Sequence, residues 1–356
     1  MQMQNIVPEN GLVPVNENDI VDVVAVDVGY GYVKAASTHG KHVIFPSVVA
    51  TAWELPLADM EGNMVGYNVT IQRKDCQEEN WFVGELALKE GQELQYTMER
   101  MKHNHPSHDV MLLTAAALAR PWQRYSELIE TDNSGPTLVV GLPVDCYQDQ
   151  EHRKKLKEHL KNLKAFVTVN DSDPVWVSFS SGNVIVYPQG AGALLTAEDL
   201  PEEGIVALVD IGHKTTDCVA VEFENGMQKL VHSMCHSVDY GVRALIEEVS
   251  EEFYKATKTK LPYSMALEVL KKESMWYKGK NIDMTNTLNQ ARFKVARAIA
   301  DQVLGKWGSR ADFVRKIYLA GGGAMELPEL MSIFPSASRI KDSQWANVMG
   351  FLEAGK

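Results

Sequence analysis

Two short turns in the sequence combine an aspartate and a glycine in the same arrangement. The first reads DVGYG at residues 27–31, and the second reads DIGHK at residues 210–214. Each follows a run of apolar residues that is typical of a buried strand and precedes a second such run. A turn of this kind presents several backbone N–H groups on one side, and such groups form a concavity that binds anions. Because glycine leaves no side chain in the way of an approaching phosphate, the two turns predict a phosphate-binding site.

The aspartates that begin the two turns predict a cation in that site. If the turns grip a polyphosphate from both sides, Asp27 and Asp210 face each other across it. Two carboxylates repel a polyphosphate unless a cation lies between them, and hydrated Mg²⁺ bridges carboxylate and phosphate oxygens. Lys34, shortly after the first turn, can add a positive point charge. We therefore expect Asp27 and Asp210 to hold Mg²⁺ through water.

Two further segments extend the pattern, and each also has a structural interpretation. The glycines at 321–323 follow an apolar strand and suit a flat base or ribose lying on the backbone, but they also fit a loop between strand and helix. Gln189 lies in PQGAGA at 188–193, where a proline followed by small residues is typical of a helix start. A carboxamide is no base near neutral pH, but it can orient an attacking water. The alternative is a buried glutamine bonded to the backbone.

The elements that must position these residues follow a duplicated plan. VAVDVGYGYVKAA at 24–36 and ALVDIGHKTTDCVAV at 207–221 share an apolar strand, an aspartate, a glycine turn and a returning strand. The two aspartates lie 183 positions apart, about half the chain, and a repeat of that length is not a solenoid. We infer two related α/β domains, each of which opens its sheet with the same β-hairpin.

The length and local composition also favour two domains, each with an insertion. A chain of 356 residues corresponds to about two domains at roughly 100–200 residues each. The polar residues 1–20 are expected to form a flexible tail, and residues 50–100 an insertion of short β-like pieces without a long helix. Residues 241–310 are expected to form a helical insertion. One of its helices has an apolar face made of Phe293, Ala296, Ala300, Val303 and Trp307.

Composition and charge exclude several classes of protein. With 45% hydrophobic and 23% charged residues, the chain is no collagen-like, low-complexity or disordered protein. The formal charge of −12 repels phosphate backbones and argues against direct binding of DNA or RNA. Four cysteines without a C-x-x-C pair (Cys76, Cys146, Cys218 and Cys235) indicate buried thiols in a reducing compartment. Because neither a signal peptide nor a membrane span stands out, we expect a cytoplasmic protein.

Taken in order, the motifs resemble those of the actin-like ATPase superfamily over nearly the whole chain from about residue 21. The five matching pieces are a first phosphate motif at 27–31 with Lys34, a first connecting helix at 188–192, a second phosphate motif at 210–212 with Thr215 and Thr216, an adenosine motif at 319–324 and a second connecting helix at 346–351. Three smaller segments, FPS at 45–47, WFVGE at 81–85 and VGLP at 140–143, are similar to the ParM/StbA group of bacterial plasmid-segregation actins.

The resemblance implies an α/β, actin-like fold, a duplicated ribonuclease-H-like arrangement of two lobes with an ATP cleft between them. The implied divisions are lobe I at 21–187 with an insertion at about 49–100, a C-terminal helix at 342–356 that joins lobe I, and lobe II at 188–341 with a helical insertion at about 241–310. The resemblance also implies Mg-dependent hydrolysis and assembly into head-to-tail filaments. In that family a DNA-binding adaptor of the ParR type links filament ends to a centromere-like DNA site, so neither direct DNA binding nor a membrane partner is expected.

The same resemblance assigns roles to individual residues. Catalysis is assigned to Gln189, Asp210 and Asp27. Nucleotide binding is assigned to Gly29, Tyr30, Gly31, Lys34, Gly212, His213, Lys214, Thr215, Thr216, Gly241, Gly321, Gly322, Gly323 and Ala324. His213 departs from the family pattern, because relatives often carry glycine or a small polar residue there. The residues leave open whether the nucleotide is ATP or GTP.

Two other functions fit the same fold, since fold does not decide function. One is a phosphotransferase or phosphatase, and the other is a nucleotide-gated binding module that does not polymerise. A kinase needs a carboxylate base for its substrate hydroxyl, and no such residue stands out in a recognisable sugar-binding motif. Light scattering or pelleting after addition of ATP and Mg²⁺ separates a filament from a binding module.

Overall fold

The computed structural model describes residues 21–55, 65–74, 76–96, 105–122, 135–179, 183–334 and 336–356. The segment 1–20, expected to be a flexible tail, lies outside the described residues. The chain divides into two compact units. Unit 1 comprises Met1–Leu142, Cys146–Thr196 and Asn347–Lys356, and unit 2 comprises Pro143–Asp145 and Ala197–Ala346. The main change from unit 1 to unit 2 thus follows Thr196, whereas the sequence suggested 188 as the start of the second lobe.

Unit 1 is built on a five-stranded sheet in the order β11-β8-β1-β2-β3. Its strands are β1 (Val23–Val28), β2 (Tyr32–Ser37), β3 (His42–Pro46), β8 (Thr137–Leu142) and β11 (Val184–Pro188). β1 pairs antiparallel with β2 and parallel with β8, and β8 pairs parallel with β11. Every residue of β1 is buried, which fits a central strand that is covered on both faces.

A second, six-stranded sheet of unit 1 has the order β10-β9-β5-β6-β4-β7. Its elements are β4 (Val48–Thr51), β5 (Tyr67–Gln72), β6 (Glu79–Val83), β7 (Gln95–Tyr96), β9 (Lys164–Val169) and β10 (Val175–Ser178), with helix α1 (Glu85–Glu90) beside them. Four of these strands come from the stretch expected as an insertion. The other two, β9 and β10, come from much later in the chain, and β5 pairs with β9.

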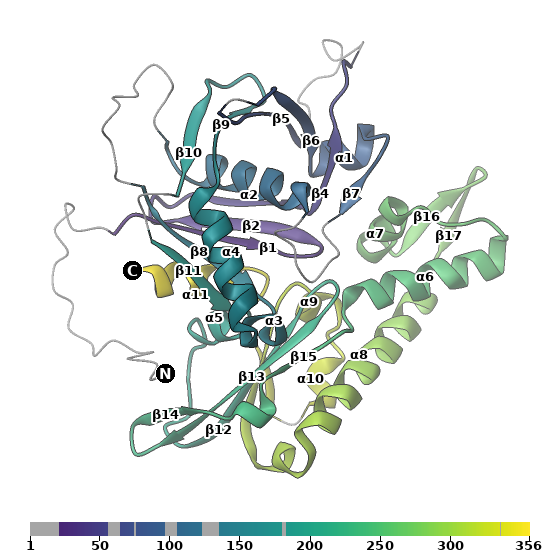
Figure 1. Ribbon diagram of the computed structural model, residues 1–356. Coiled ribbons are helices and arrows are strands. Elements are labelled where there is room, and N and C mark those ends of the chain that lie inside the picture. The colour runs from purple at the N-terminus through teal and green to yellow at the C-terminus, as the bar shows by residue number, and fades with distance from the viewer. Residues whose placement is uncertain are drawn as a thin grey trace. The chain divides into compact units, whose positions relative to one another are not determined.

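Two helices of unit 1 show how local sequence sets their ends. Helix α2 (Pro106–Ala119) lies between the two sheets in Figure 1 and has Pro106 in its first turn. Helix α4 (Gln150–Asn162) begins after Asp149, whose side chain accepts hydrogen bonds from two backbone N–H groups of the first turn. Leu156 and Leu160 of α4 are buried, so this amphipathic helix covers the sheet as its leucine spacing predicts.

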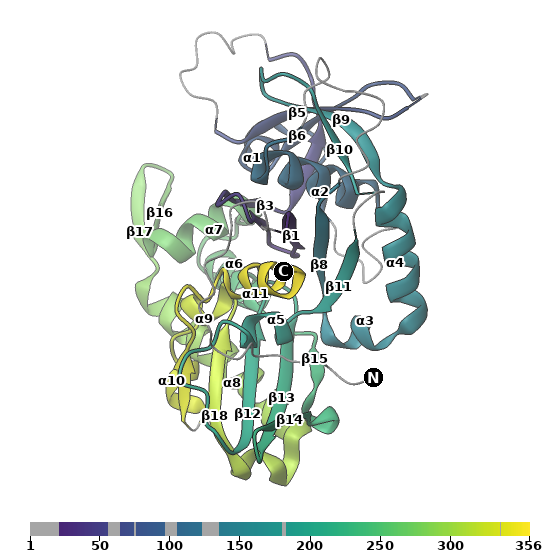
Figure 2. The same cartoon turned by 90° about the vertical axis from the view of Figure 1, so that its left-hand side faces the viewer.

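The sheet of unit 2 repeats the plan of the main sheet of unit 1. Its order is β14-β13-β12-β18-β19, and β15 also pairs with β13. The strands are β12 (Gly204–Ile211), β13 (Thr216–Glu224), β14 (Met227–Leu230), β15 (His236–Val238), β18 (Val314–Ala320) and β19 (Ala337–Arg339). Figure 2 shows β14, β13, β12 and β18 side by side. We number the five strands of each path, leaving out β15, by their order along the chain. Both sheets then have the order 3-2-1-4-5 with the same strand directions, so the duplication expected from the sequence is confirmed.

The rest of unit 2 is mainly helical, and short elements complete both units. The helical part contains α6 (Val242–Thr257), α7 (Tyr263–Lys272), the hairpin β16 (Ser274–Tyr277) and β17 (Lys280–Asp283), α8 (Thr285–Trp307) and η6 (Gly308–Phe313). The short elements are α3 (Val144–Gln148), α5 (Ala191–Leu194), η5 (His232–Met234), α9 (Gly323–Glu326), α10 (Leu330–Ile333) and α11 (Ala346–Gly355).

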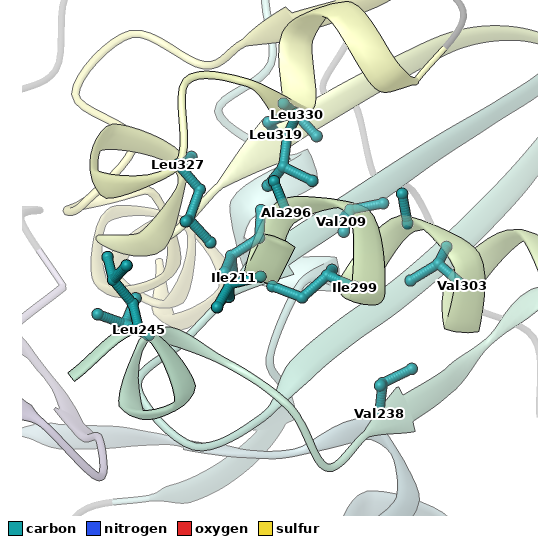
Figure 3. Packing of buried hydrophobic residues seen from close by; sticks show 14 of the residues in the cluster. Val209, Ile211, Val238, Leu245, Ala296, Ile299, Val303, Leu319, Leu327 and Leu330 are labelled. Atoms are coloured by element: carbon teal, nitrogen blue, oxygen red, sulfur yellow. The ribbon is translucent and has the colours of Figure 1, made fainter. Parts of the chain in front are cut away.

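The core of unit 2 joins these helices to the sheet. Figure 3 shows Leu245 of α6 and Ile299 of α8 packed toward Ile211 at the end of β12. These side chains are fully buried, and burying each contributes about 1.5–3 kcal/mol. Because Ile211 lies one position after Asp210, the same core that stabilises the unit also fixes the strand end where the second aspartate lies.

The structure corrects two expectations about side chains. The helix from Phe293 to Trp307 is present, but Phe293 is 59% exposed while the other residues of the expected apolar face are buried, so Phe293 lies off that face. Three of the cysteines are buried, but Cys76 is exposed, so the expectation of four buried thiols is wrong at Cys76. Across the described ranges, no helix combines the length and apolar character needed to span a membrane.

Candidate functional site

The turn between β1 and β2 is closed by its own backbone. The Gly29 N–H donates to the Tyr32 carbonyl oxygen at 3.2 Å. A Cβ on residue 29 would lie only 2.7 Å from that oxygen, so the turn requires glycine there. Farther round the turn, the Gly31 carbonyl accepts from the Ser47 N–H at 2.9 Å, and the Tyr30 side chain is buried. The turn is therefore held in one conformation by contacts within unit 1.

Asp27, at the end of β1, is the centre of a buried polar cluster. The Gln189 Nε2 donates to Asp27 Oδ1 at 2.8 Å, and the Lys34 Nζ donates to Asp27 Oδ2 at 3.4 Å. The register of the hairpin places Asp27 directly opposite Lys34. Both Asp27 and Gln189 are more than 90% buried. The structure therefore brings together three residues that the sequence assigned to catalysis and phosphate binding.

The contact with Asp27 fixes the orientation of the Gln189 side chain. An ionised carboxylate only accepts hydrogen bonds, so the amide nitrogen of Gln189 must face Asp27. That leaves the amide oxygen, Oε1, on the other side, where an accepting group could orient water. The backbone of Gln189 is fixed as well, because its N–H donates to the Leu142 carbonyl at 2.8 Å.

The segment around Gln189 is braced by α11 of unit 1. The Gly190 N–H donates to Asn347 Oδ1 at 2.9 Å, and a Cβ on Gly350 would lie 1.8 Å from the Gly192 carbonyl oxygen. Helices α5 and α11 thus cross backbone against backbone. Helix α5 begins at Ala191, so a helix does start within PQGAGA as expected, although Pro188 itself is the last residue of β11 and precedes the first turn.

The turn between β12 and β13 of unit 2 has the same geometry as the first. The Gly212 N–H donates to the Thr215 carbonyl oxygen at 2.9 Å, and a Cβ on residue 212 would lie 2.8 Å from that oxygen. The Gly212 carbonyl accepts from the Val242 N–H at 3.1 Å. A Cβ on Gly241 would lie 2.6 Å from the same carbonyl oxygen, so the start of α6 can approach the turn only with glycine at 241.

The side chains of the second turn are engaged within unit 2. The Thr216 hydroxyl donates to the Tyr240 carbonyl at 2.8 Å, and the Thr215 hydroxyl donates to Asp217 Oδ2 at 3.2 Å. The Nε2 of His213 lies 2.9 Å from the Tyr263 hydroxyl at the start of α7. The side chains of His213, Thr215 and Thr216 are therefore each held by a partner within unit 2.

The three-glycine turn packs directly on the end of β12. Gly321 has φ +81°, and a Cβ there would lie 2.4 Å from Asp210 Oδ1 and 2.3 Å from the Ile211 carbonyl oxygen. A Cβ on Gly323 would meet Ile211 as well. Gly322 is different, since the nearest atoms to its Cβ position belong to Gln344 at 4.0 Å. The turn thus brings Asp210 beside the glycines, and a Cβ at Gly322 would make only an ordinary van der Waals contact. Helix α9, which contains Ala324, follows.

We expect Gly321→Ala to destabilise unit 2 well beyond the cost of its backbone conformation. Gly279, in the turn of the β16–β17 hairpin, has nearly the same φ of +78° but nothing within 4 Å of its Cβ position. Gly279→Ala therefore measures the cost of positive φ alone, about 1–2 kcal/mol. In Gly321→Ala the new Cβ also clashes with the Ile211 carbonyl and the Asp210 carboxylate, which should lower the free energy of unfolding by about 1–3 kcal/mol more. Thermal unfolding of the two variants tests this, and equal losses of Tm would remove the argument for close packing at Gly321.

His213 is held neutral near physiological pH. Burial lowers the pKa of His213 to about 4, and the nearby positive charge of Arg243 acts in the same direction, whereas Glu247 opposes it. Its ring also lies edge-on to Tyr263, with 6.0 Å between ring centroids. A neutral imidazole can accept the Tyr263 hydroxyl hydrogen bond, so the pair links the second turn to the helical part of unit 2.

The pKa of His213 predicts a loss of stability on acidification. Between pH 6.5 and pH 4 the unfolded chain binds a proton on this histidine that the folded chain does not bind, so the free energy of unfolding falls as the pH falls. His236 has its pKa lowered to about 4 by burial and contributes in the same direction. We expect His213→Gln to lose less Tm than the wild type between pH 6.5 and 4.5, with the remaining loss due in part to His236. Parallel Tm curves for the two proteins would contradict this.

Sequence reasoning missed a buried acidic residue next to the second turn. Asp217 is fully buried, accepts from Ser237 Oγ at 2.5 Å and from the Val144 N–H at 2.8 Å, and also takes the Thr215 hydroxyl. Burial raises the pKa of Asp217, against the effect of these hydrogen bonds. One signal was available. In the second hairpin Asp217 lies opposite Asp210, just as Lys34 lies opposite Asp27 in the first. Aligning the two copies of the repeat therefore identifies Asp217 as the counterpart of Lys34.

The aspartate of each turn, taken by itself, fits a hydrated Mg²⁺ ion better than a closed protein metal site. Among the described residues, no group of three or more His, Cys, Asp and Glu side chains could hold a metal ion. Each turn instead begins at one buried carboxylate, Asp27 in unit 1 and Asp210 in unit 2. Mg²⁺ usually keeps several waters and uses one or two carboxylates together with substrate phosphates. One carboxylate in each turn is therefore compatible with Mg²⁺ that arrives with a phosphate ligand.

Two family models match the chain, one in each half. The model described as "Actin like proteins N terminal domain" matches residues 25–192, and the model described as "Archaeal actin homologue MreB-like, C-terminal" matches residues 208–332. These matches include both turns and the glycines at 321–323.

Individual relatives match over almost the whole chain. An archaeal actin homologue of Thermoplasma volcanium is 26% identical over 344 residues, which are 94% of this chain and 98% of the relative. A 15-stranded ParM filament from Clostridium botulinum matches with a TM-score of 0.79 and 26% identity, covering 94% of this chain and 99% of the other. An archaeal actin homologue in complex with ADP matches with a TM-score of 0.70 and 23% identity over the same shares.

Proposed function

Since this chain belongs to the actin-like, filament-forming proteins, we propose that it binds ATP with Mg²⁺, hydrolyses it and assembles into head-to-tail filaments. The proposal of nucleotide binding rests on the repeated turn. In each copy the glycine N–H donates to the carbonyl of the third residue after it, and a buried aspartate lies two positions before the glycine. Two relatives support the proposal, because an archaeal actin homologue was solved with ADP and a ParM was solved as a filament.

We propose that the phosphates of one nucleotide take backbone N–H groups from both turns, as anion-binding turns do. The ribose or base would lie against Gly322, which is partly exposed and whose Cβ position has no neighbour closer than 4.0 Å. Lys34 would offer its charge to the phosphates without leaving Asp27, since its Nζ hydrogen bond to that carboxylate is long at 3.4 Å. Binding of this kind would leave the hydrogen bonds that close the two turns intact.

Gln189 is the residue that we propose orients the attacking water. Its amide nitrogen is committed to Asp27, and its amide oxygen can accept a hydrogen bond from water. The backbone bonds to Leu142 and Asn347 hold the segment on both sides. A positioned group of this kind acts by geometry, because it saves the reorganisation that free water needs.

Asp27 and Asp210 would hold Mg²⁺ through water. When bound, the ion neutralises developing charge on the phosphate oxygens. Asp27 keeps both of its oxygens in hydrogen bonds to Gln189 and Lys34, so its contact with the ion would pass through a water molecule rather than a direct bond. This fits a coordination sphere made mainly of water and phosphate.

The proposed cellular role is to move or segregate DNA, as in plasmid partition, in the cytoplasm. The formal charge of −12 opposes direct DNA binding, so a separate, basic adaptor of the ParR type would connect filament and DNA. Nucleotide state would control assembly, because a ligand shifts a protein toward the conformation that it binds more tightly.

Sedimentation and electron microscopy test the central proposal. With Mg²⁺ and ATP, we expect the protein to pellet above a critical concentration, to form filaments, and to depolymerise as the nucleotide is hydrolysed. A parallel series with GTP identifies the preferred nucleotide. Uniform single particles at high protein concentration with both nucleotides would contradict the filament proposal. A rate of phosphate release no higher than that of buffer alone would contradict the proposal of hydrolysis. A gel shift with DNA and this protein alone should show no complex.

A further inference from the structure

The outer part of the helical region is a basic segment on an acidic protein. We call residues 254–283 the tip; it comprises the end of α6, all of α7 and the β16–β17 hairpin. The tip holds seven lysines against three acidic residues, whereas the rest of the chain holds 28 basic and 44 acidic residues. All seven lysines are exposed. Figure 1 shows the hairpin and α7 beside α6.

The tip also exposes large apolar side chains. Trp276 is 73% exposed, the most exposed of the large hydrophobic side chains in the described part of the chain, and Tyr254 and Met265 are about half exposed. On the hairpin, Met275 and Tyr277 pack against the core of unit 2, while Trp276 between them points to the other face. Because side chains alternate along a strand, Trp276 points away from the core that Met275 and Tyr277 contact.

The scaffold that carries Trp276 is firmly attached. Tyr277 lies edge-on to Phe253 with 5.3 Å between ring centroids, and its hydroxyl bonds the Thr259 hydroxyl at 2.6 Å. The Glu273 carbonyl accepts from the Met284 N–H at 2.8 Å, which closes the base of the hairpin. A tryptophan on a fixed backbone has only its side-chain rotations left to lose when a partner covers it, and exposed tryptophans are common binding hot spots.

We propose that Trp276 and the lysines around it dock onto an acidic surface of a second copy of this chain. The proposal rests on the assembly proposed above and names its contact. Outside the tip, each copy carries a large excess of negative charge, so a second copy offers the charge that complements the tip. A contact between two different surfaces of one chain is also the kind that continues into an open filament.

The charges favour a protein partner over nucleic acid. Lys255 is paired with Glu251 and Glu252, and Lys272 with Glu268, so part of the positive charge of the tip is already balanced at its surface. The molecule as a whole repels a phosphate backbone, whereas a local acidic patch on a protein meets the tip alone.

Trp276→Ser tests the contact, with Phe313→Ser as its matched control. Phe313, in η6, is 72% exposed, and both substitutions remove an exposed aromatic ring from unit 2. We expect Trp276→Ser to raise the critical concentration for ATP-dependent pelleting by about tenfold or more. Phe313→Ser should leave it near the wild-type value. Lys278→Glu with Lys280→Glu should act like Trp276→Ser, and higher salt should weaken wild-type assembly.

Each outcome separates the contact from the proposed function. A fluorescent ATP analogue should bind the wild type and both serine variants equally. If the wild type assembles and Trp276→Ser assembles as well, or if both serine variants fail alike, the tip is not the contact. If the wild type itself does not assemble with ATP or GTP, the filament proposal fails, and the tip contact fails with it. A DNA gel shift of the wild type that Trp276→Ser abolishes would make nucleic acid the occupant and overturn the proposal.

Discussion

Asp27→Asn and Asp210→Asn should each reduce Mg²⁺-dependent ATP hydrolysis by about 10²–10³-fold, the usual effect of losing one preorganised electrostatic contact. Asparagine keeps the size of each side chain, and at position 27 its Oδ1 can still accept from Gln189. The change thus removes a charge with little change in shape. Because the proposed site needs a carboxylate from each turn, neither aspartate should compensate for the other. Phosphate release at saturating ATP, measured across a Mg²⁺ titration, is the readout.

Asp301→Asn is the matched control for these variants. Asp301 lies exposed on α8 and pairs with Arg297 one helical turn away, so the substitution removes the same charge far from either turn in sequence. It should hydrolyse ATP at the wild-type rate. Wild-type turnover in either Asp27→Asn or Asp210→Asn would show that the two turns do not form one nucleotide site.

Gln189→Ala should slow hydrolysis by about 10²-fold while the affinity for ATP stays close to the wild type. The reason is that the proposed contact acts on the attacking water, and a loss of positioning lowers the rate in the bound state. Gln189→Glu should also be slow, because it places a second carboxylate where the amide donates to Asp27 at 2.8 Å. Two such groups resist ionising together, which raises the pKa of one of them.

Single-turnover hydrolysis and equilibrium binding of an ATP analogue distinguish the two possible roles of Gln189. Gln302→Ala, an exposed position on α8, serves as the control for loss of an amide. If affinity for ATP collapses in Gln189→Ala while the single-turnover rate is unchanged, Gln189 is a structural or binding residue, and its assignment to the water is wrong.

The parts of the fold that the sequence predicts well are those set by nearby residues. The turns after Asp27 and Asp210 are closed within four residues and need glycine for a local reason, so their pattern is visible in the sequence. The buried strands beside them are read from apolar runs in the same way. The duplication follows, because two copies of one local pattern half a chain apart imply two copies of one sheet.

The parts that the sequence does not predict depend on contacts between distant segments. The buried environment of Asp217 depends on distant partners, because the Val144 N–H, 73 positions earlier, and the Ser237 hydroxyl, 20 positions later, both donate to it. Strands β9 and β10 belong to the same sheet as β5, which lies nearly a hundred residues earlier, because β9 pairs with β5. The pattern of apolar residues in a sequence does not show which strands pair. Phe293 matches the apolar spacing of its helix but is exposed, because the buried face of α8 is centred on Ile299 and Val303 and Phe293 lies beyond its edge.

The crossing of α5 and α11 makes unit 1 depend on the last residues of the chain. Unit 1 includes residues 347–356, and Asn347 of α11 holds the Gly190 N–H beside Gln189. A Cβ on Gly355 would lie 2.5 Å from Val23 Cγ1, so the helix also seats against the first strand of the sheet. During translation, residues 197–346 of unit 2 leave the ribosome before this helix, and domains generally fold as units during synthesis. Unit 1, although it is begun first, is therefore completed last, and a chain that stalls before residue 347 carries a finished second unit beside an open first one.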